Sequence, residues 1–209
     1  MKWNVGTKIA AGFGLALAIF VIVGVVSYQA VVQQAEDSYW VSHTHEVQNE
    51  LTRLLSNLQD AETGQRGYVI TGADRYLAPY TAGAAAIEGN RKRLLQLVSD
   101  NPRQVARAEA LAPLIADKLS ELQETIDARR THDFTSAQSL VVTDRGKKAM
   151  DGIRQTVQDM TLEEETLLAQ RSATTQIAAR NARWTIVLGT LAAVVLAGLA
   201  GLADRKSVV

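Results

Sequence analysis

Two carboxylates and a guanidinium lie within the run DAETGQRGYVITG, residues 60–72, and make it the stretch best equipped to bind a charged group. Asp60, Glu62 and Arg66 supply these groups, and such groups form the charge-assisted hydrogen bonds of ion pairs and ligand sites. Glu62 and Arg66 are four residues apart, a spacing that stabilises a helix by about 0.2–0.5 kcal/mol. The run therefore predicts a helix that carries an ion-pair cluster or a ligand site.

The same run contains three glycines, which are unfavourable inside a helix. A glycine inside a helix costs about 1 kcal/mol relative to alanine, so Gly64 and Gly67 need a structural reason. They share one helical face with Asp60 and Thr71, at spacings of four, three and four residues. We expect both glycines to let another helix approach closely, and Gly72 to end the helix.

Histidines and glutamates elsewhere offer weaker chemistry. His43 and His45 are two residues apart and would point to different faces of a helix, which argues against a metal pair. HEVQNEL, residues 45–51, partly matches the phosphoacceptor box of histidine kinases, but Glu50 replaces its proline and Gln48 its basic residue. The favoured interpretation is that the histidines are solvated or line a helical stalk.

Catalytic constellations are not found in the sequence. LEEET, residues 162–166, lacks the Glu-x-x-His pair of di-iron bundles, so its glutamates are interpreted as a solvated face. No nucleophile–base pair, metal-ligand cluster or phosphate-binding loop occurs, so we expect neither an enzyme nor a cofactor.

Composition narrows the class of protein further. The 209 residues contain no cysteine, which excludes disulfides and thiolate chemistry. The 22 Lys and Arg balance 22 Asp and Glu, so no excess charge indicates nucleic-acid binding. Few aromatics and three prolines favour helices over sheets.

Two uncharged apolar runs, residues 9–28 and 184–203, are each long enough to cross the hydrocarbon core of a bilayer as a helix. The first is longer than the apolar core of a signal peptide and lacks a cleavage site after Tyr28, which favours an uncleaved anchor. Small residues recur every fourth position in both runs, a pattern suited to close packing between the spans or across a dimer. They are Ala10, Gly14 and Ala18, then Gly189, Ala193, Ala197 and Gly201.

Basic residues at the chain ends predict the orientation. Lys2, Lys8, Arg205 and Lys206 lie outside the two spans and favour a cytoplasmic location for residues 1–8 and 204–209. Arg180 and Arg183 lie on the opposite side and weaken that argument. We expect residues 29–183 to be periplasmic or extracellular, in a multi-pass protein of the bacterial inner membrane.

The segment between the spans predicts an antiparallel four-helix bundle, an all-α fold. Its first helix continues from the first span and carries a buried seam at spacings of four and three residues. The seam is Val47, Leu51, Leu54, Leu58, Ala61, Gln65 and Tyr68. Corners are expected at 71–74, with Asp74 as a helix N-cap, and at 99–102, and Pro113 predicts a kink. A short helix at 135–142 should precede the last long helix, which runs into the second span.

Basic residues of the last helix should then reach the membrane-distal end of the first. We expect a polar cluster there, made of Asp60, Glu62, Arg66, Lys147 and Lys148. The cluster either fixes the helix register, which is the favoured interpretation, or belongs to a ligand site. The residues of such a ligand site would be Arg66, Tyr68, Tyr76 and Tyr80.

The stretch from Trp40 to Tyr80 resembles the signature of the third type of CHASE domain, an extracytoplasmic sensory module of bacterial receptors. The matching residues are His43, Thr44, Glu46, Val47, Asp60 to Tyr68, Thr71, Gly72, Tyr76, Leu77, Pro79 and Tyr80. A weaker likeness extends over nearly the whole chain. The candidate sensory or structural motif is Asp60, Glu62, Thr63, Gly64, Gln65, Arg66, Gly67, Tyr68, Thr71, Gly72, Tyr76 and Tyr80.

The resemblance implies a sensory input module with a role in signal transduction, for example in a two-component system. Such modules feed histidine kinases, diguanylate cyclases or chemotaxis-type receptors, and this output is expected in cis or in trans because residues 204–209 carry none. A homodimer, the lipid bilayer and an unknown small-molecule or protein ligand are the expected partners. The alternative is a stand-alone membrane scaffold that holds partner proteins and has no output domain.

Overall fold

The computed structural model describes residues 5–205, and these are almost entirely helical. The elements are α1 (Val5–Thr71), a 3-10 helix η1 (Asp74–Leu77), α2 (Ala78–Leu97), α3 (Pro102–Thr131), α4 (Phe134–Val141) and α5 (Arg145–Arg205). No strand occurs within this described range, so the predicted all-α class is confirmed. The chain divides into two compact units: residues 41–168 form the bundle unit, and residues 1–40 with 169–209 form the paired-helix unit.

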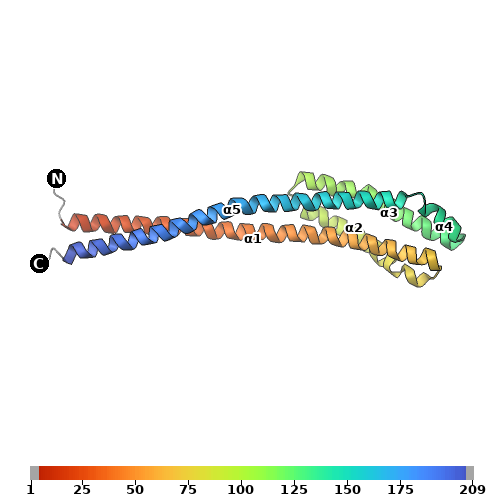
Figure 1. Cartoon of the computed structure of the whole chain (residues 1–209), viewed down its shortest axis with the longest axis horizontal. Coiled ribbons are helices and arrows are strands. Elements are labelled where there is room, and N and C mark those ends of the chain that lie inside the picture. Colours follow the sequence, from red (N-terminus) through yellow and green to blue (C-terminus); the bar gives the residue numbers. More distant parts are fainter. Residues whose placement is uncertain (1–4, 206–209) are drawn as a thin grey trace. The chain divides into compact units, whose positions relative to one another are not determined.

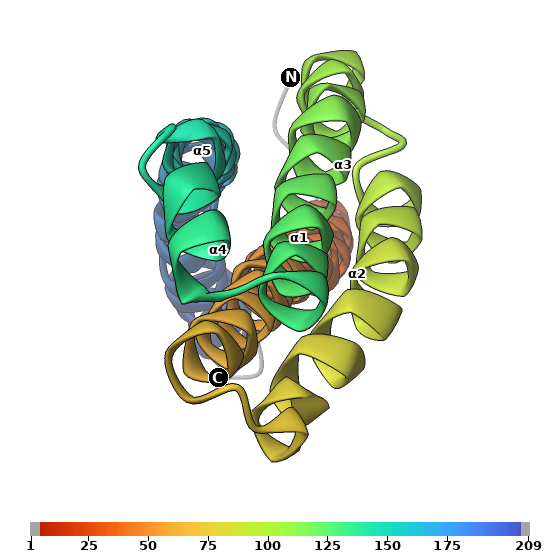
Figure 2. The same ribbon diagram turned by 90° about the vertical axis from the view of Figure 1, so that its right-hand side faces the viewer.

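Four long helices, α1, α2, α3 and α5, build the bundle unit, as the end-on view of Figure 2 shows. We call the end that contains Gly72 and α4 the turn end, and the end that contains residues 41 and 168 the entry end. The two middle helices, α2 and α3, lie wholly within this unit, as predicted. Its apolar core contains Leu54, Ile87, Leu111, Ile153 and Met160, and each of these residues is at most 1% exposed.

The seam predicted along the first helix is confirmed. Every residue of the seam is buried in the bundle, including the polar Gln65, which is 2% exposed. The same buried face of α1 also carries a polar residue, Thr44, which is fully buried. A helix seam at spacings of four and three residues thus predicted which face of α1 packs against its neighbours.

The corners follow the local chemistry of the chain. Gly72 ends α1 in the left-handed conformation, with φ +69°, and its N–H donates to the carbonyl of Tyr68 at 2.7 Å. Asp74 is not the predicted N-cap: it begins η1, and Ala73 and Leu77 occupy the cap positions of η1 and α2. The Thr71 hydroxyl accepts the Ala73 N–H at 3.2 Å, so a threonine rather than an aspartate satisfies this turn.

The second and third corners match the prediction more closely. Asn101 caps α3 by accepting the N–H groups of Arg103 at 3.1 Å and Gln104 at 3.4 Å. Asp133 caps the short helix α4, which covers nearly the predicted range, through the N–H of Ser136 at 2.8 Å. Helix α3 continues through Pro113, which lies on its exposed side.

Glycines set the spacing between α1 and α2. A methyl group added to Gly64 would lie 2.6 Å from the backbone nitrogen of Tyr80, and one added to Gly67 would lie 2.9 Å from the Tyr76 ring. From the other helix, a methyl group on Gly83 would meet the carbonyl oxygen of Asn57 and lie 3.2 Å from the nitrogen of Ala61. The predicted close approach at Gly64 and Gly67 is confirmed, and its partner is the η1–α2 segment.

The paired-helix unit contains the N-terminal part of α1 and the C-terminal part of α5, which lie antiparallel in Figure 1. A methyl group on Gly189 would lie 2.8 Å from Val23, and Ala193 and Ala16 are buried in this contact region. Packing of small residues between the spans is thus confirmed for Gly189 and Ala193, whereas Gly14 has open space around it. Both helices contain segments long and apolar enough to cross a membrane.

Gly83→Ala is expected to destabilise the bundle by about 1–3 kcal/mol, because the added methyl group meets the backbone of α1 rather than a movable side chain. Gly89→Ala is the matched control on the same helix, since open space surrounds Gly89 and the change should stabilise α2 by up to about 1 kcal/mol. Urea unfolding of the whole chain in detergent, followed by far-ultraviolet circular dichroism, measures both. Equal midpoints for the two variants would contradict the assigned contact.

Candidate functional site

A buried ammonium group lies at the turn end of the bundle, between carboxylates from two helices. Lys118 of α3 is 2% exposed, and its Nζ lies 3.1 Å from Oε2 of Glu121 and 3.5 Å from Oε1 of Glu62 on α1. Arg66 adds a second cation, with a guanidinium nitrogen 2.6 Å from the same Glu62 oxygen. We call Glu62, Arg66, Lys118 and Glu121 the turn-end cluster. Two positive and two negative charges alternate in it, so each buried charge has an opposite neighbour.

Helix spacing explains how this cluster forms. Glu62 and Arg66 are one turn apart on α1, and Lys118 and Glu121 are one turn apart on α3. Helix α5 begins beside them: a methyl group on Gly146 would lie 2.5 Å from Cδ of Glu121 and 2.9 Å from the Lys118 nitrogen. Three helices therefore meet at one set of charges, and the glycine leaves room for them.

The first turn of α5 also contributes to the electrostatics of this cluster. Backbone N–H groups at a helix N-terminus favour nearby negative charge, and Glu121 lies against that turn. The Thr125 hydroxyl, fully buried, donates to the backbone carbonyl of Glu121 at 2.7 Å and lies 3.4 Å from its Oε1. Glu121 is thereby held by a cation, a hydroxyl group and a helix terminus.

The predicted membership of the polar cluster is partly wrong. Glu62 and Arg66 belong to it, but the cation that joins them is Lys118 rather than Lys147 or Lys148. Lys147 pairs with Asp151 of its own helix at 2.6 Å, and that hydrogen bond raises the pKa of its ammonium group. Lys148 is exposed. The two lysines follow Gly146 on the outer side of α5, which turns them away from α1.

The other residues of the candidate motif have separate positions. Asp60 and Thr63 are exposed on α1, and Thr71 donates to the carbonyl of Gly67 at 2.8 Å. Gln65 is buried, and its Nε2 has no hydrogen-bond partner among the residues that the structure describes.

Three tyrosines of the predicted ligand site have different intramolecular partners. Tyr68 is 4% exposed, with the guanidinium of Arg130 lying 5.9 Å from its ring centre. Tyr76 packs against Gly67, and Tyr80 donates its hydroxyl to Oε1 of Gln123 on α3 at 2.8 Å. The structure thus joins these residues through helix packing, and their role as a ligand site stays a prediction.

A second polar cluster, missed by the sequence interpretation, lies at the entry end. Glu164 of α5 is 3% exposed and accepts hydrogen bonds from Thr44 of α1 at 3.3 Å and from the Gln104 amide of α3 at 3.0 Å. Gln104 also donates to the carbonyl of Met160 at 2.9 Å. We call Thr44, Gln104 and Glu164 the entry-end cluster. The interpretation of LEEET as a solvated face is wrong at Glu164, because α1 and α3 cover this position.

Further charged side chains lie close to the entry-end cluster. Glu163 is 13% exposed at its side chain and forms ion pairs with Arg103 and Arg107 of α3, the second at 3.5 Å. His43 has its Nε2 3.9 Å from a carboxylate oxygen of Asp100, whereas His45 is exposed. Within residues 5–205 the structure brings together no set of three metal-ligating side chains.

Comparisons with known proteins match this arrangement of helices. A family model described as the CHASE3 domain matches residues 37–174, about two thirds of the chain. The chain belongs to the CHASE3 domain family. This CHASE3 domain is an extracytoplasmic sensory domain, and the chain is the membrane-anchored sensory input module of a signalling receptor.

A solved structure supports the fold assignment. The crystal structure of the sensor domain of the histidine kinase HK9 from Rhodopseudomonas palustris aligns with a TM-score of 0.56 and 22% sequence identity. The alignment covers 60% of this chain and 98% of the HK9 sensor domain. None of the curated proteins compared matches the chain.

Lys118→Met is expected to destabilise the CHASE3 bundle by about 3–5 kcal/mol, because it leaves Glu121 buried without its cation. Adding Glu121→Gln should recover part of this loss, since the second change removes the unpaired charge. Lys147→Met removes an exposed lysine and should leave the unfolding midpoint almost unchanged. Thermal unfolding of the three variants measures the effect, and a similar loss in Lys118→Met and Lys147→Met would contradict the buried role of Lys118.

Tyr80 is expected to make the stability of the bundle sensitive to alkaline pH. Burial, and then the nearby Asp127 carboxylate, raise the pKa of the Tyr80 hydroxyl above its ordinary value of 10.0. The stability contributed by the neutral hydroxyl is therefore fully present below pH 10.0 and is lost as the pH rises through the higher folded-state pKa. Wild type should lose stability above pH 10.0 more steeply than Tyr80→Phe.

Urea midpoints measured across this range test the assignment. Tyr76→Phe serves as the control and should keep the wild-type slope, because the described residues offer the Tyr76 hydroxyl no hydrogen bond. Parallel profiles for wild type and Tyr80→Phe would contradict the predicted role of the Tyr80–Gln123 hydrogen bond.

Proposed function

We propose that the chain crosses the bacterial cytoplasmic membrane twice, through residues 9–28 and 184–203, and places residues 29–183 on the extracytoplasmic side. Residues 1–8 and 204–209 would then face the cytoplasm. The observation that carries this proposal is that α1 and α5 each contain a candidate membrane-spanning segment and a long segment of the CHASE3 bundle. The same two helices therefore link the sensory core to the bilayer.

The input is proposed to act on the balance between two arrangements of the bundle. A ligand or partner shifts such a balance only when it binds one arrangement more tightly than the other. The candidate motif between Asp60 and Tyr80 lies where α1, η1 and α2 pack against each other through glycines. A change at this end would alter the turn-end cluster, which also contacts the first turn of α5.

The output is proposed to be a cytoplasmic histidine kinase, diguanylate cyclase or chemotaxis-type domain, in cis or in trans. A homodimer would couple two copies so that small piston, rotation or scissoring motions of α1 and α5 reach that output. The sensory module itself is proposed to be non-catalytic. Support comes from its family and from the mutual pairing of the charged groups in the turn-end cluster.

Cysteine labelling tests the proposed topology cleanly, because the natural sequence contains no cysteine. Ser99→Cys, in the loop between α2 and α3, should react with a membrane-impermeant maleimide in spheroplasts. Thr7→Cys should react only after permeabilisation, because residues 1–8 are proposed to be cytoplasmic. Labelling of Thr7→Cys in sealed spheroplasts, or protection of Ser99→Cys, would contradict this topology.

A further inference from the structure

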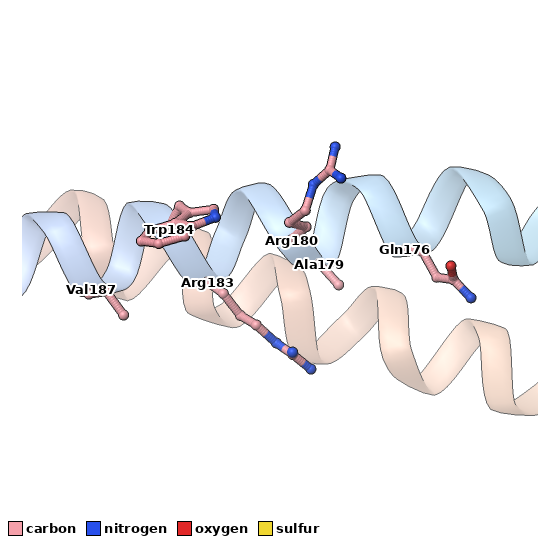
Figure 3. Close-up of a pocket in the computed structure, with 6 residues that line it drawn as sticks. All are labelled: Gln176, Ala179, Arg180, Arg183, Trp184 and Val187. Carbon is pink, nitrogen blue, oxygen red and sulfur yellow. The ribbon is translucent and has the colours of Figure 1, made fainter.

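A hollow on α5 lies at the boundary of the second apolar span. It has a volume of about 500 Å³, within the size range of small-molecule sites. Gln176, Ala179, Arg180, Arg183, Trp184 and Val187 line it, all from α5. Figure 3 shows that Arg180 and Arg183 extend to opposite sides of the helix, with Ala179 between them.

The guanidinium groups of Arg180 and Arg183 have no acidic residue near them in the sequence of α5 or in the facing part of α1. Helix α5 carries no acidic residue from position 166 to 203, and α1 carries none from Val5 to Ala35. Both arginines are exposed, and within residues 5–205 neither forms an ion pair or hydrogen bond through its side chain. Arginine groups of this kind bind phosphate through paired N–H donors, so the hollow has the charge and chemistry of an anion site.

The hollow is also graded in polarity along the helix. The amide of Gln176 and the two guanidinium groups occupy one part, and the indole of Trp184 and the side chain of Val187 occupy the other. Beyond this apolar part, Leu188 is 59% exposed and Leu191 is 57% exposed. A soluble anion would use only the polar part, whereas an amphiphile with a charged head and an apolar chain would use both.

From this gradation we infer that the hollow binds the headgroup of an anionic phospholipid. The phosphate pairs with the guanidinium group of Arg180 or of Arg183, which extend from the two edges of the hollow, and an acyl chain follows Trp184 and Val187 toward the apolar span. Tryptophan at the edge of a membrane span is the usual interfacial anchor, which agrees with its position here. The inference rests on the proposed membrane topology and adds a specific lipid class to it.

This inference also explains why two arginines lie on the side that the positive-inside rule disfavours. A bound anionic lipid supplies the missing countercharge at the extracytoplasmic surface. The lipid would then hold α5 at the extracytoplasmic edge of the second apolar span. Lipid composition thereby becomes a second input to the sensory module.

The test uses the full chain in liposomes of equimolar phosphatidylcholine and phosphatidylglycerol. After mild detergent extraction, native mass spectrometry counts the lipids that remain on the protein. Wild type should retain phosphatidylglycerol in excess, and Arg180→Gln or Arg183→Gln should each reduce the excess by about 5-fold. The control variant Lys92→Gln with Lys148→Gln removes two positive charges, as many as Arg180 and Arg183 carry together, from exposed positions of the bundle and should retain the wild-type excess.

Two further arms separate the alternatives. Millimolar inorganic phosphate should not displace the lipid, because it cannot use the apolar part of the hollow, and displacement would overturn the lipid assignment in favour of a soluble anion. Carbonate washing of the liposomes shows whether the wild-type chain is integrated. Extraction by carbonate would overturn the proposed topology together with the lipid site, whereas an integrated protein without phosphatidylglycerol excess would overturn the lipid site alone.

Discussion

The pairing of one buried ammonium group determines how the turn end of this sensory bundle is put together. Lys118 lies on α3, but the carboxylates that make its burial tolerable come from α1 and from α3 itself, at 3.5 Å and 3.1 Å. A buried ammonium group without these partners would strongly destabilise the fold. The register of α1 against α3 is therefore set by charge as well as by apolar packing. The start of α5 packs against the same charges, since a methyl group at position 146 would lie 2.5 Å from Cδ of Glu121.

Polar clusters at the two ends divide the bundle core in a way that suits a sensor. Apolar residues from all four long helices form most of the core, while buried hydrogen bonds and ion pairs join the helices at each end. Buried polar groups have strict geometric requirements, so a bundle built this way favours a few discrete arrangements over continuous sliding. Both clusters include residues of α1 and contact α5, and these are the helices that contain the apolar spans.

Local patterns in the sequence predicted the helices and much of the packing. The spacing of Val47, Leu51 and Leu54 was sufficient to identify the buried face of α1, and Gly64 and Gly67 identified a close helix contact. The identity of the buried cation was not predictable in this way. Lys118 has the local sequence of a solvated helix face, and its burial depends on Glu62, which is distant in the sequence. Glu164 was misjudged for the same reason, because its partners Thr44 and Gln104 come from other helices.

Signalling by this module requires that α5 carry the state of the bundle to the membrane as a continuous helix. The most direct measurement joins a reporter kinase domain after residue 205 and inserts one, two, three or four alanines after Ala169. Each added alanine rotates the following part of the helix by about 100°, so four alanines make slightly more than one full turn. Kinase activity should therefore vary with the helical period and return toward the wild-type level at four alanines. Activity that is independent of the number of inserted alanines would contradict the claim.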